Sequence, residues 1–230
     1  MSTTFPVGPE IDSERLARIP TLPVKPAPVE LTGPRVRLIP LEPARNAPAL
    51  FAMSNGQPIQ LGERSIGAYD PVTLVWRYLR YGPFEDVAGC EAYLSDLAAG
   101  GDILPMTLID RQSDRPIGTL SFMANAPAHL KIEIGHIWIS PVMQGSGVIY
   151  EAAYLMLRHC FDLRYRRLEW KCDSLNERSR RTALSIGFQF EGIQQYHMIA
   201  RGRNRDTAWY RILDYEWPEV RARLEQRLGI

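Results

Sequence analysis

Gln144–Val148 joins two glycines to the start of a predicted helix, and such a combination can bind an anion. Glycines let the backbone approach a ligand closely, while the free N–H groups of a first helical turn and the positive end of the helix dipole face it. Phosphate is the expected ligand. The alternative is a plain turn, because glycines between a strand and a helix are often only turn-makers.

The strand that must lead into this turn alternates apolar and polar residues, which is typical of a half-buried strand. Its apolar residues change parity half-way along: Ile132 and Ile134 fall on one face, and Ile137 and Ile139 fall on the other. One extra residue near Gly135–His136 would restore a continuous apolar face. A β-bulge adds one residue in this way, so the sequence predicts a bulged strand.

A second strand and a capped helix follow the anion turn and its helix. Arg167–Asp173 is predicted to be a strand, with Trp170 and Cys172 on one face. Asn176 is placed to cap the next helix, because an asparagine side chain accepts hydrogen bonds from first-turn N–H groups. Gly187 is expected to end that helix.

The remaining elements are predicted from the same signals of periodicity and turn chemistry. Residues 55–86 are expected to be irregular, because N-G, Y-D-P and Y-G-P-F interrupt their short apolar pieces. Strands are expected over Arg35–Ile39, Ile103–Ile109, Ile117–Ala124, Phe188–Ala200 and Thr207–Asp214, and helices over Pro43–Met53, Val87–Ala99, Val148–Asp162 and Trp217–Leu228.

This succession of parts resembles the GNAT superfamily of acetyl-CoA-dependent N-acetyltransferases, and above all its ribosomal-protein N-terminal acetyltransferase branch. The layout matches over Val36–Trp217, and the motifs match over Glu133–Gly192. The motifs read E-I-G-H-I-W-I, Q-G-S-G-V, L-E-W-K-C-D-S-L-N-E-R-S and I-G-F-Q-F-E-G. The family's phosphate loop is Q/R-x-x-G-x-G/A; Gln144 and Gly147 fit it, whereas Ile149 stands where a small residue is expected.

The resemblance implies an α+β fold in α/β/α layers, with a mixed, mostly antiparallel twisted sheet, a bulged central strand and flanking helices. It also implies an N-acetyltransferase that moves the acetyl group of acetyl-CoA, its co-substrate, to a primary amine of a small molecule or of a peptide or protein N-terminus. Transfer would occur by direct attack in a ternary complex, without a metal.

The resemblance also assigns the acetyl-CoA contacts. Asn176 is expected to hydrogen-bond the pantetheine, and Ser179 to protonate the departing thiolate. Many family members use a tyrosine later in this helix, but Ala183 stands at that position. The backbone of Ile137, Trp138 and Ile139 is expected to pair with the pantetheine arm, and the amides of Gln144, Gly145, Ser146, Gly147 and Val148 to hold the pyrophosphate.

A base or proton path is needed to deprotonate the acceptor amine. With the bulge counted, Glu133, His136 and Trp138 share the face opposite the isoleucines. Glu133 is the first candidate for the base, directly or through water, and a purely structural carboxylate is an equal alternative. His136 is the second candidate, since an unperturbed pKa near ~6.5 suits proton relay, although a lone strand histidine is more often simply packed.

The acceptor cleft of the resembled fold is walled by the variable region that residues 55–86 would form. Trp76, Tyr81 and Phe84 are candidates to line it, with the protein core as the alternative for each ring. A basic turn at Arg201, Arg203 and Arg205 is either a solvated hairpin tip or a grip for an acidic acceptor. Neither the acceptor nor the choice between monomer and homodimer follows from the sequence.

Composition limits the remaining possibilities. The net charge of +1 gives no overall field to recruit nucleic acid or an anionic membrane, and no apolar run is long enough for a membrane span. The beginning of the sequence lacks a signal pattern, which favours the cytoplasm. Three cysteines without C-x-x-C spacing argue against a disulfide framework or a zinc site. Residues 1–31 are interpreted as a proline-rich arm, and residues 32–230 as the GNAT-like domain.

Two other function classes are alternatives to the enzyme. A non-catalytic acyl-CoA-binding sensor or scaffold would keep the anion turn without the chemistry. Asn176, Ser179 and the strand carboxylate Glu133 favour the enzyme over this alternative. A nucleotide-binding module is disfavoured, because no Walker lysine follows the glycines.

Overall fold

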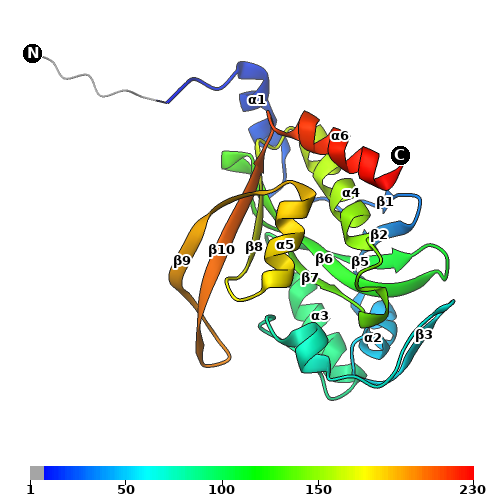
Figure 1. Ribbon diagram of the computed structural model, residues 1–230. Helices are drawn as coiled ribbons and strands as arrows, with labels where there is room; N and C mark the ends of the chain where they lie inside the picture. The colour runs from blue at the N-terminus through cyan, green and yellow to red at the C-terminus, as the bar shows by residue number, and fades with distance from the viewer. Residues whose placement is uncertain (1–7) are drawn as a thin grey trace, which may run out of the picture.

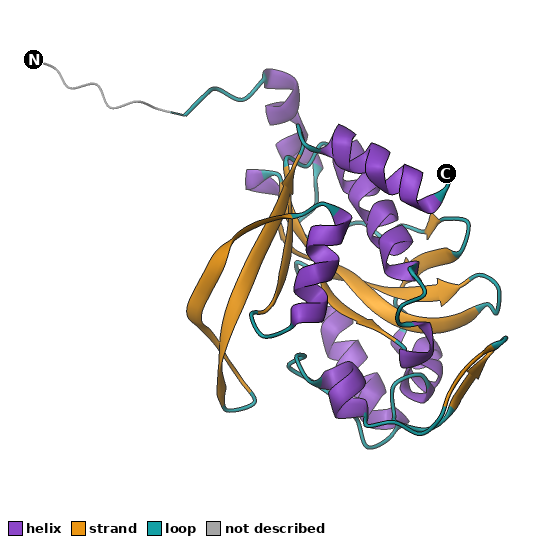
Figure 2. Cartoon of the chain, in the orientation of Figure 1, coloured by secondary structure: helices purple, strands orange, loops and turns teal. Residues whose placement is uncertain are grey.

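The computed structural model describes residues 8–230, which form one eight-stranded sheet with helices on both faces (Figures 1 and 2). The strand order is β1-β2-β5-β6-β7-β8-β10-β9, and a separate two-stranded ribbon, β3-β4, lies beside it. The α+β expectation is confirmed. The strands are β1 (Leu31–Thr32), β2 (Val36–Pro40), β3 (Ile59–Leu61), β4 (Arg64–Ile66), β5 (Leu104–Asp110), β6 (Arg115–Ala126), β7 (Lys131–Ile139), β8 (Arg167–Asp173), β9 (Gln189–Ala200) and β10 (Arg203–Leu213).

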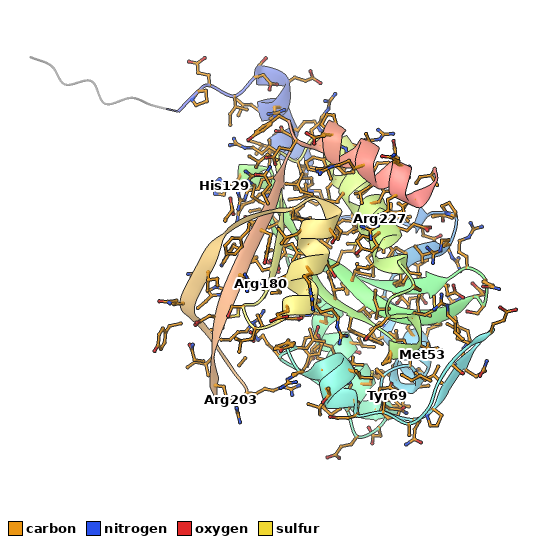
Figure 3. The ribbon with its side chains drawn as sticks, viewed as in Figure 1. Met53, Tyr69, His129, Arg180, Arg203 and Arg227 are labelled. Carbon is orange, nitrogen blue, oxygen red and sulfur yellow. The ribbon has the colours of Figure 1, made fainter. Side chains whose placement is uncertain are left out.

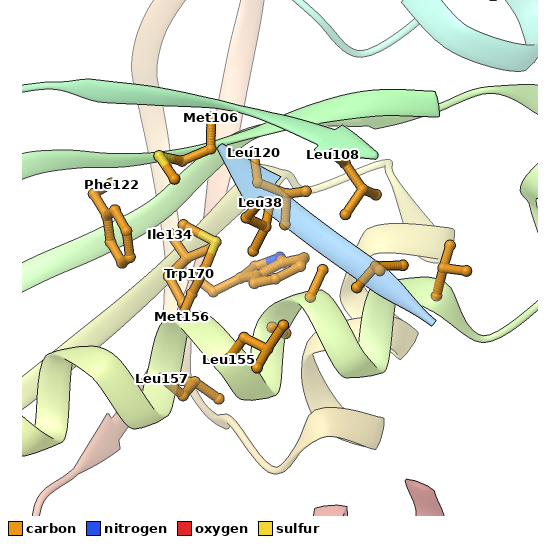
Figure 4. Close-up of a cluster of buried hydrophobic side chains, with 14 of the residues drawn as sticks. Leu38, Met106, Leu108, Leu120, Phe122, Ile134, Leu155, Met156, Leu157 and Trp170 are labelled. Carbon is orange, nitrogen blue, oxygen red and sulfur yellow. The ribbon is translucent and has the colours of Figure 1, made fainter. Parts of the chain in front are cut away.

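The helices divide into two layers. Figure 2 shows α4, α5 and α6 together on one side of the sheet and α2 and α3 on the other. Asn46 on α2 contacts Thr107 of β5, whose neighbours Met106 and Leu108 point the opposite way, into the core under α4 (Figure 4). The helices are α1 (Ser13–Arg18), α2 (Pro43–Ala52), α3 (Val87–Ala99), α4 (Val148–Asp162), α5 (Glu177–Ile186) and α6 (Trp217–Leu228), with a π-helical turn, η2, at Val72–Trp76.

The predicted bulge lies at the centre of β7. Thr119 of β6 pairs with Trp138, and Ser121 pairs with Gly135, so one residue of β6 stands opposite two residues of β7. His136 at the bulge has φ 49°, a left-handed conformation that bulges accommodate. The shift restores the apolar face of the strand, as the alternation predicted.

Strands β7 and β8 run parallel but pair over a short distance only. Their register covers Lys131–Arg167, Ile132–Leu168 and Glu133–Glu169. Beyond Glu133, β7 continues to Ile139 with β6 alone as its paired neighbour among the described strands. The sheet therefore opens on the β8 side of β7, where backbone groups of β7 face a gap.

Helix α4 is anchored at its start by a buried carboxylate. Glu151 is 2% exposed, and its Oε1 accepts hydrogen bonds from the backbone N–H groups of Arg35 and Val36, at 2.8 and 3.0 Å. A side chain on Gly33 would collide with this oxygen. The contact fixes the first turn of α4, and hence the glycine turn before it, against the edge of the sheet.

The proline-rich arm begins outside the described residues, and its described part, from residue 8 onward, packs on the body of the same chain. Asn125 donates to the carbonyls of Pro23 and Val24, at 2.9 Å each, and Arg15 of α1 lies 2.7 Å from Asp214. Strand β1 crosses the predicted division between residues 31 and 32, because Leu31 already pairs with β2. Within the described residues, no helix is long and apolar enough to cross a membrane.

The predicted C-terminal hairpin needs a correction. Its second strand was expected to begin at Thr207, with a long basic turn before it, but β10 begins at Arg203 and leaves only Arg201 and Gly202 in the turn. Arginines and a glycine give this segment a low strand propensity, and it forms a strand because it pairs with β9. Arg205 therefore lies on a strand instead of at a loop tip.

Candidate active site

A cavity of about 340 Å³ lies where β7 and β8 part. Its wall comes from β7, β8, the loop before α3, the β9–β10 hairpin and the first turn of α5. Of the predicted catalytic residues, Glu133, His136 and Ser179 all line it, together with Asn176 and Ile137. The fold thus brings residues from β7 and from the start of α5 to one space.

Glu133 is buried at the mouth of this opening, with 6% of its surface exposed. Its Oε2 lies 2.7 Å from Nζ of Lys171 on β8. Burial raises the pKa of Glu133 above its usual range, because desolvation disfavours the charged form, and the charge of Lys171 offsets this rise only in part. A general base is most effective when its pKa lies near the working pH, so the shift suits Glu133 to proton abstraction.

Lys171 was missed in the sequence, although its signal was present. Trp170 and Cys172 face the helix side of β8, so the residue between them must face the other side, towards Glu133. The Nζ of Lys171 also lies 3.6 Å from Glu169 and 4.2 Å from the ring centre of Trp209. A carboxylate on each strand and an aromatic ring thus surround this ammonium group.

His136 is held by two tyrosines. The hydroxyls of Tyr81 and Tyr93 lie 3.0 and 3.2 Å from its Nδ1, and its ring stacks on Tyr81. Burial, together with the charges of Arg80 and Arg205, lowers the pKa of His136 to about 4. The imidazole is therefore neutral near neutral pH and is a weaker base than a histidine in water.

Ser179 and Asn176 meet at the start of α5. Asn176 Oδ1 accepts the N–H of Ser179 at 3.1 Å and so caps the helix, as predicted. The indole N–H of Trp170 donates to Ser179 Oγ at 3.0 Å. The serine oxygen is thus held by a donor, which leaves the hydroxyl proton for another acceptor. The cap leaves Asn176 its side-chain NH₂ to offer to a ligand carbonyl.

The glycine turn before α4 has the expected backbone shape. Gly145 and Gly147 have φ of 76° and 86°, and a Cβ built on Gly145 would meet no atom within 4 Å. This open space lies in front of a helix of 15 residues, so the first-turn amides and the helix dipole face it. The residues fit an anionic group such as a pyrophosphate.

Three of the five predicted amide donors already have a partner inside the turn. Gln144 N donates to the carbonyl of Pro141 and Ser146 N to that of Met143, both at 3.2 Å, and Val148 N makes a long contact of 3.5 Å with Ser146 Oγ. This narrows the amides that are free for an anion to those of Gly145 and Gly147. The prediction treated every amide of the turn as free, whereas a tight turn consumes some of its own donors.

Cationic side chains flank the same turn. Arg35 Nη2 donates to the carbonyl of Ser146 at 2.7 Å, and Arg178 of α5 donates to Gln144 Oε1 at 2.7 Å. The side-chain amide of Gln144 in turn donates to the carbonyls of Leu74 and Ile139. These contacts fix the turn and add positive charge beside it, which favours an anion there.

Of the three aromatics proposed for the acceptor cleft, only Tyr81 lines the cavity. Trp76 is 2% exposed, donates its indole N–H to the carbonyl of Ser54, and packs edge-on against Phe84. Trp76 and Phe84 therefore support Tyr81 from behind instead of facing a substrate. A sequence pattern cannot distinguish an inward-facing ring from a cleft-facing ring within an irregular segment.

The hairpin tip closes the cavity from the other side. Arg201 donates to the carbonyl of Tyr81 at 2.6 Å and also to that of Gly82. Behind this contact, His197, Met198 and Arg205 line the cavity. The sequence had named Arg205 only as part of a basic turn that could grip an acidic acceptor, and it had not placed His197 or Met198 in the site, because the hairpin joins the site only through the tertiary fold.

Both the sequence and the structure are similar to those of known acetyltransferases. The profile of the acetyltransferase (GNAT) domain family matches residues 35–189. The uncharacterized N-acetyltransferase p20 of Bacillus licheniformis is 27% identical over 147 residues, which cover 62% of this chain and 82% of that protein. The crystal structure of a GCN5-related N-acetyltransferase from Brucella melitensis superposes with a TM-score of 0.78 at 35% identity, covering 88% of this chain and 86% of the other.

A further relative bears on the branch within the family. A Bacillus subtilis protein with the provisional name ribosomal N-acetyltransferase YdaF is 32% identical over 88 residues, 38% of this chain and 48% of that protein. The chain thus spans about half the length of YdaF. The similarity agrees with the resemblance of the motifs to the ribosomal branch. With a matched domain, a shared fold and the cavity between β7 and β8, this chain belongs to the GNAT family of acetyl-CoA-dependent acetyltransferases.

Proposed function

We propose that the protein transfers the acetyl group of acetyl-CoA to a primary amine by direct attack in a ternary complex. Glu133 is the general base, and Ser179 is the acid that protonates the departing thiolate. The observation that carries the proposal is that both side chains line one cavity, at the point where β7 leaves β8. The buried carboxylate has a raised pKa, and the serine is held by Trp170.

The chemistry follows from these positions. An ammonium group cannot attack a thioester, so Glu133 accepts its proton, directly or through a water molecule. The neutral amine then forms the new C–N bond, and the C–S bond breaks as the carbonyl re-forms. The CoA sulfur leaves as a thiolate and takes its proton from Ser179, and the second proton, which the nitrogen loses as it becomes an amide, restores the serine hydroxyl through solvent. Glu133 and Ser179 thus serve as base and acid, whereas the thioester carbon belongs to the co-substrate.

The proposed binding of acetyl-CoA uses the open side of β7. The backbone of Ile137–Ile139 faces the gap and pairs with the pantetheine arm, while Asn176 supplies an amide donor. The pyrophosphate lies at the start of α4, against Gly145 and Gly147. The thioester would then lie between Glu133 and Ser179, as the assigned roles require.

The experiment that tests this function is a screen of amines by thiol release from acetyl-CoA. Peptides with free N-termini, amino acids, polyamines and aminoglycosides are each incubated with the protein, and acetylated products are identified by mass spectrometry. We expect amine-dependent thiol release that is strongly reduced in Glu133→Gln. Calorimetric binding of acetyl-CoA without turnover on any amine would contradict the proposal and favour a non-catalytic acyl-CoA sensor.

A further inference from the structure

Arg205 is a half-buried cationic side chain that the proposed chemistry does not use. It lies on β10, lines the cavity, and has 14% of its side chain exposed. Its Nε is buried without a hydrogen-bond partner among the described residues, and its Nη1 contacts only a thioether, Met198 Sδ, at 3.7 Å. A buried charge without a strong partner is costly, so such a group commonly awaits an anion.

The cavity wall carries more cationic side chains than carboxylates, and Arg205 has no close carboxylate among the described residues. Three cationic side chains line it, Arg80, Lys171 and Arg205, against two carboxylates, Glu133 and Asp173. Lys171 is satisfied by Glu133 at 2.7 Å and by a second carboxylate on its own strand. Asp173 approaches Arg205 only to 4.0 Å. The cavity therefore keeps uncompensated positive charge beside the proposed base.

The charge of Arg205 is felt across the same cavity. It helps to lower the pKa of His136 and of His197, and it acts on the pKa of Glu133 in the same direction. These groups stand on β7 and β9, on both sides of the opening. The guanidinium thus faces the space in which the acceptor amine must meet Glu133.

The same cavity is closed towards the hairpin tip. Arg201 binds the carbonyls of Tyr81 and Gly82, which joins the tip to the loop before α3. A cavity of about 340 Å³ is at the small end for a ligand site, and it must also admit the acetyl end of the co-substrate. Such an enclosure favours a small acceptor over a long peptide.

We propose that the acceptor is a small molecule with a carboxylate close to its primary amine, and that Arg205, assisted by Arg80, binds this carboxylate while Glu133 faces the amine. This inference rests on the proposed function and names its substrate class. The planar guanidinium can bind a carboxylate through two parallel hydrogen bonds, and the unpartnered Nε is one of the donors.

The test compares amines that differ only in the carboxylate. Thiol release is measured for the common α-amino acids, β-alanine and 4-aminobutyrate, each beside its carboxamide. We expect the acid of the best pair to exceed its amide in kcat/KM by on the order of 10- to 100-fold, the contribution of a charge-assisted hydrogen bond. Arg205→Met should remove this preference mainly through KM, and Arg205→Lys should keep part of it.

The matched control is Arg203→Met. Arg203 lies at the hairpin tip of the same strand, is exposed, and is not part of the cavity wall (Figure 3). It should keep the full preference for the acid. Circular dichroism and calorimetric acetyl-CoA affinity establish that each variant is folded. Equal kcat/KM for acids and amides, or an Arg205→Met protein that keeps the preference, would overturn the inference.

Two further outcomes separate this inference from the function on which it rests. A short acidic peptide that outperforms every free amino acid would overturn the small acceptor. Absence of turnover with every amine would contradict the proposed acetyltransfer instead. In that case calorimetric titration of the CoA-bound protein with the same acid and amide pairs decides the inference, because preferential binding of the acid requires no transfer.

Discussion

At the scale of single residues, the proposed proton chemistry depends on the contact between Glu133 and Lys171. Their contact of 2.7 Å keeps a counter-charge beside the carboxylate, while burial pushes its pKa upward. Because Lys171 also contacts Glu169, it keeps a partner when Glu133 is altered. The pair can therefore be dissected by substitution without leaving an isolated buried ammonium group.

Glu133→Gln keeps the shape of the side chain but removes its basicity. We expect kcat to fall by about 10²- to 10⁴-fold near neutral pH, with little change in acetyl-CoA affinity. The raised pKa of Glu133 means that wild-type activity declines as the pH falls through that value. The pH–rate profile of the variant lacks this acidic decline. The ratio of the wild-type rate to the variant rate shrinks as the pH rises, because the amine then deprotonates unaided. Steady-state rates from pH 5 to 10 measure this. The double variant Glu133→Gln/Lys171→Met removes both charges of the pair and is the control for the change in net charge. Full turnover per folded Glu133→Gln molecule would make Glu133 structural.

Ser179→Ala tests protonation of the departing thiolate separately from deprotonation of the amine. The hydroxyl accepts the indole N–H of Trp170 at 3.0 Å, whereas the helix cap uses the backbone N–H of Ser179, so removal of the hydroxyl leaves the cap of Asn176 intact. We expect the rate to fall at every pH at which the amine is already neutral, in contrast to the pH-dependent deficit of the Glu133 variant. Steady-state rates on the alkaline side measure this. Ser179→Thr is the matched control, because it keeps a hydroxyl, and a Ser179→Ala protein with wild-type alkaline rates would exclude the assigned role.

At the scale of elements, the sequence predicts the bounds of a helix or strand correctly where residues near its ends mark them. Helices α3, α4 and α6 and strand β8 match their predicted ranges, because glycines, prolines and periodicity mark their ends. The start of β10 was not predicted, since a strand rich in arginine is defined by its partner and not by its own propensity.

The candidate site divides in the same way. The glycine turn, the bulge and the Asn176 cap are contiguous motifs, and the sequence alone located them. The alternation of β8 gives the face of Lys171, and the basic turn of the hairpin includes Arg205, but the contacts that bring both into the site join strands far apart in the chain. Sequence spacing carries no information about which distant side chains meet, so the partners of these two residues required the fold.

Gly147→Val tests the turn before α4 as an element. Gly147 has φ of 86°, which a β-branched residue adopts only with strain of about 1–2 kcal/mol. A Cβ there would meet Arg35 at 3.6 Å, an ordinary contact, so the fold has room for the substitution. We expect weakened acetyl-CoA binding by calorimetry in a folded protein with a modestly lower Tm. Gly202→Val, at φ of 70° in the hairpin turn, is the control for strain alone. Unchanged affinity in folded Gly147→Val would remove the turn from the site.

At the scale of the whole molecule, His136 is a junction of three segments. Its Nδ1 contacts Tyr81 in the loop and Tyr93 on α3, while its backbone carbonyl accepts the hydroxyl of Thr119 on β6. Tyr81 and Tyr93 also stack on each other, with ring centres 4.0 Å apart. The cavity wall at Tyr81 is therefore coupled to the central strand through one neutral imidazole, and protonation of that ring opposes the folded state.

His136→Asn should make the folded protein less sensitive to acid. Burial lowers the pKa of His136 from 6.5 in the unfolded chain to about 4 in the folded state. Above pH 6.5 both states hold the neutral ring; as the pH falls from 6.5 towards 4, only the unfolded chain gains the proton, and stability is lost. The full shift corresponds to roughly 3 kcal/mol. Asparagine tolerates the left-handed backbone at this position and does not titrate. Urea unfolding at pH 7, 6, 5 and 4.5 measures both proteins, and the opposing titration of Glu133 is common to both. The wild-type free energy of unfolding should fall more steeply with acid than that of the variant, whereas parallel curves would show that the neutral imidazole is not what this junction requires.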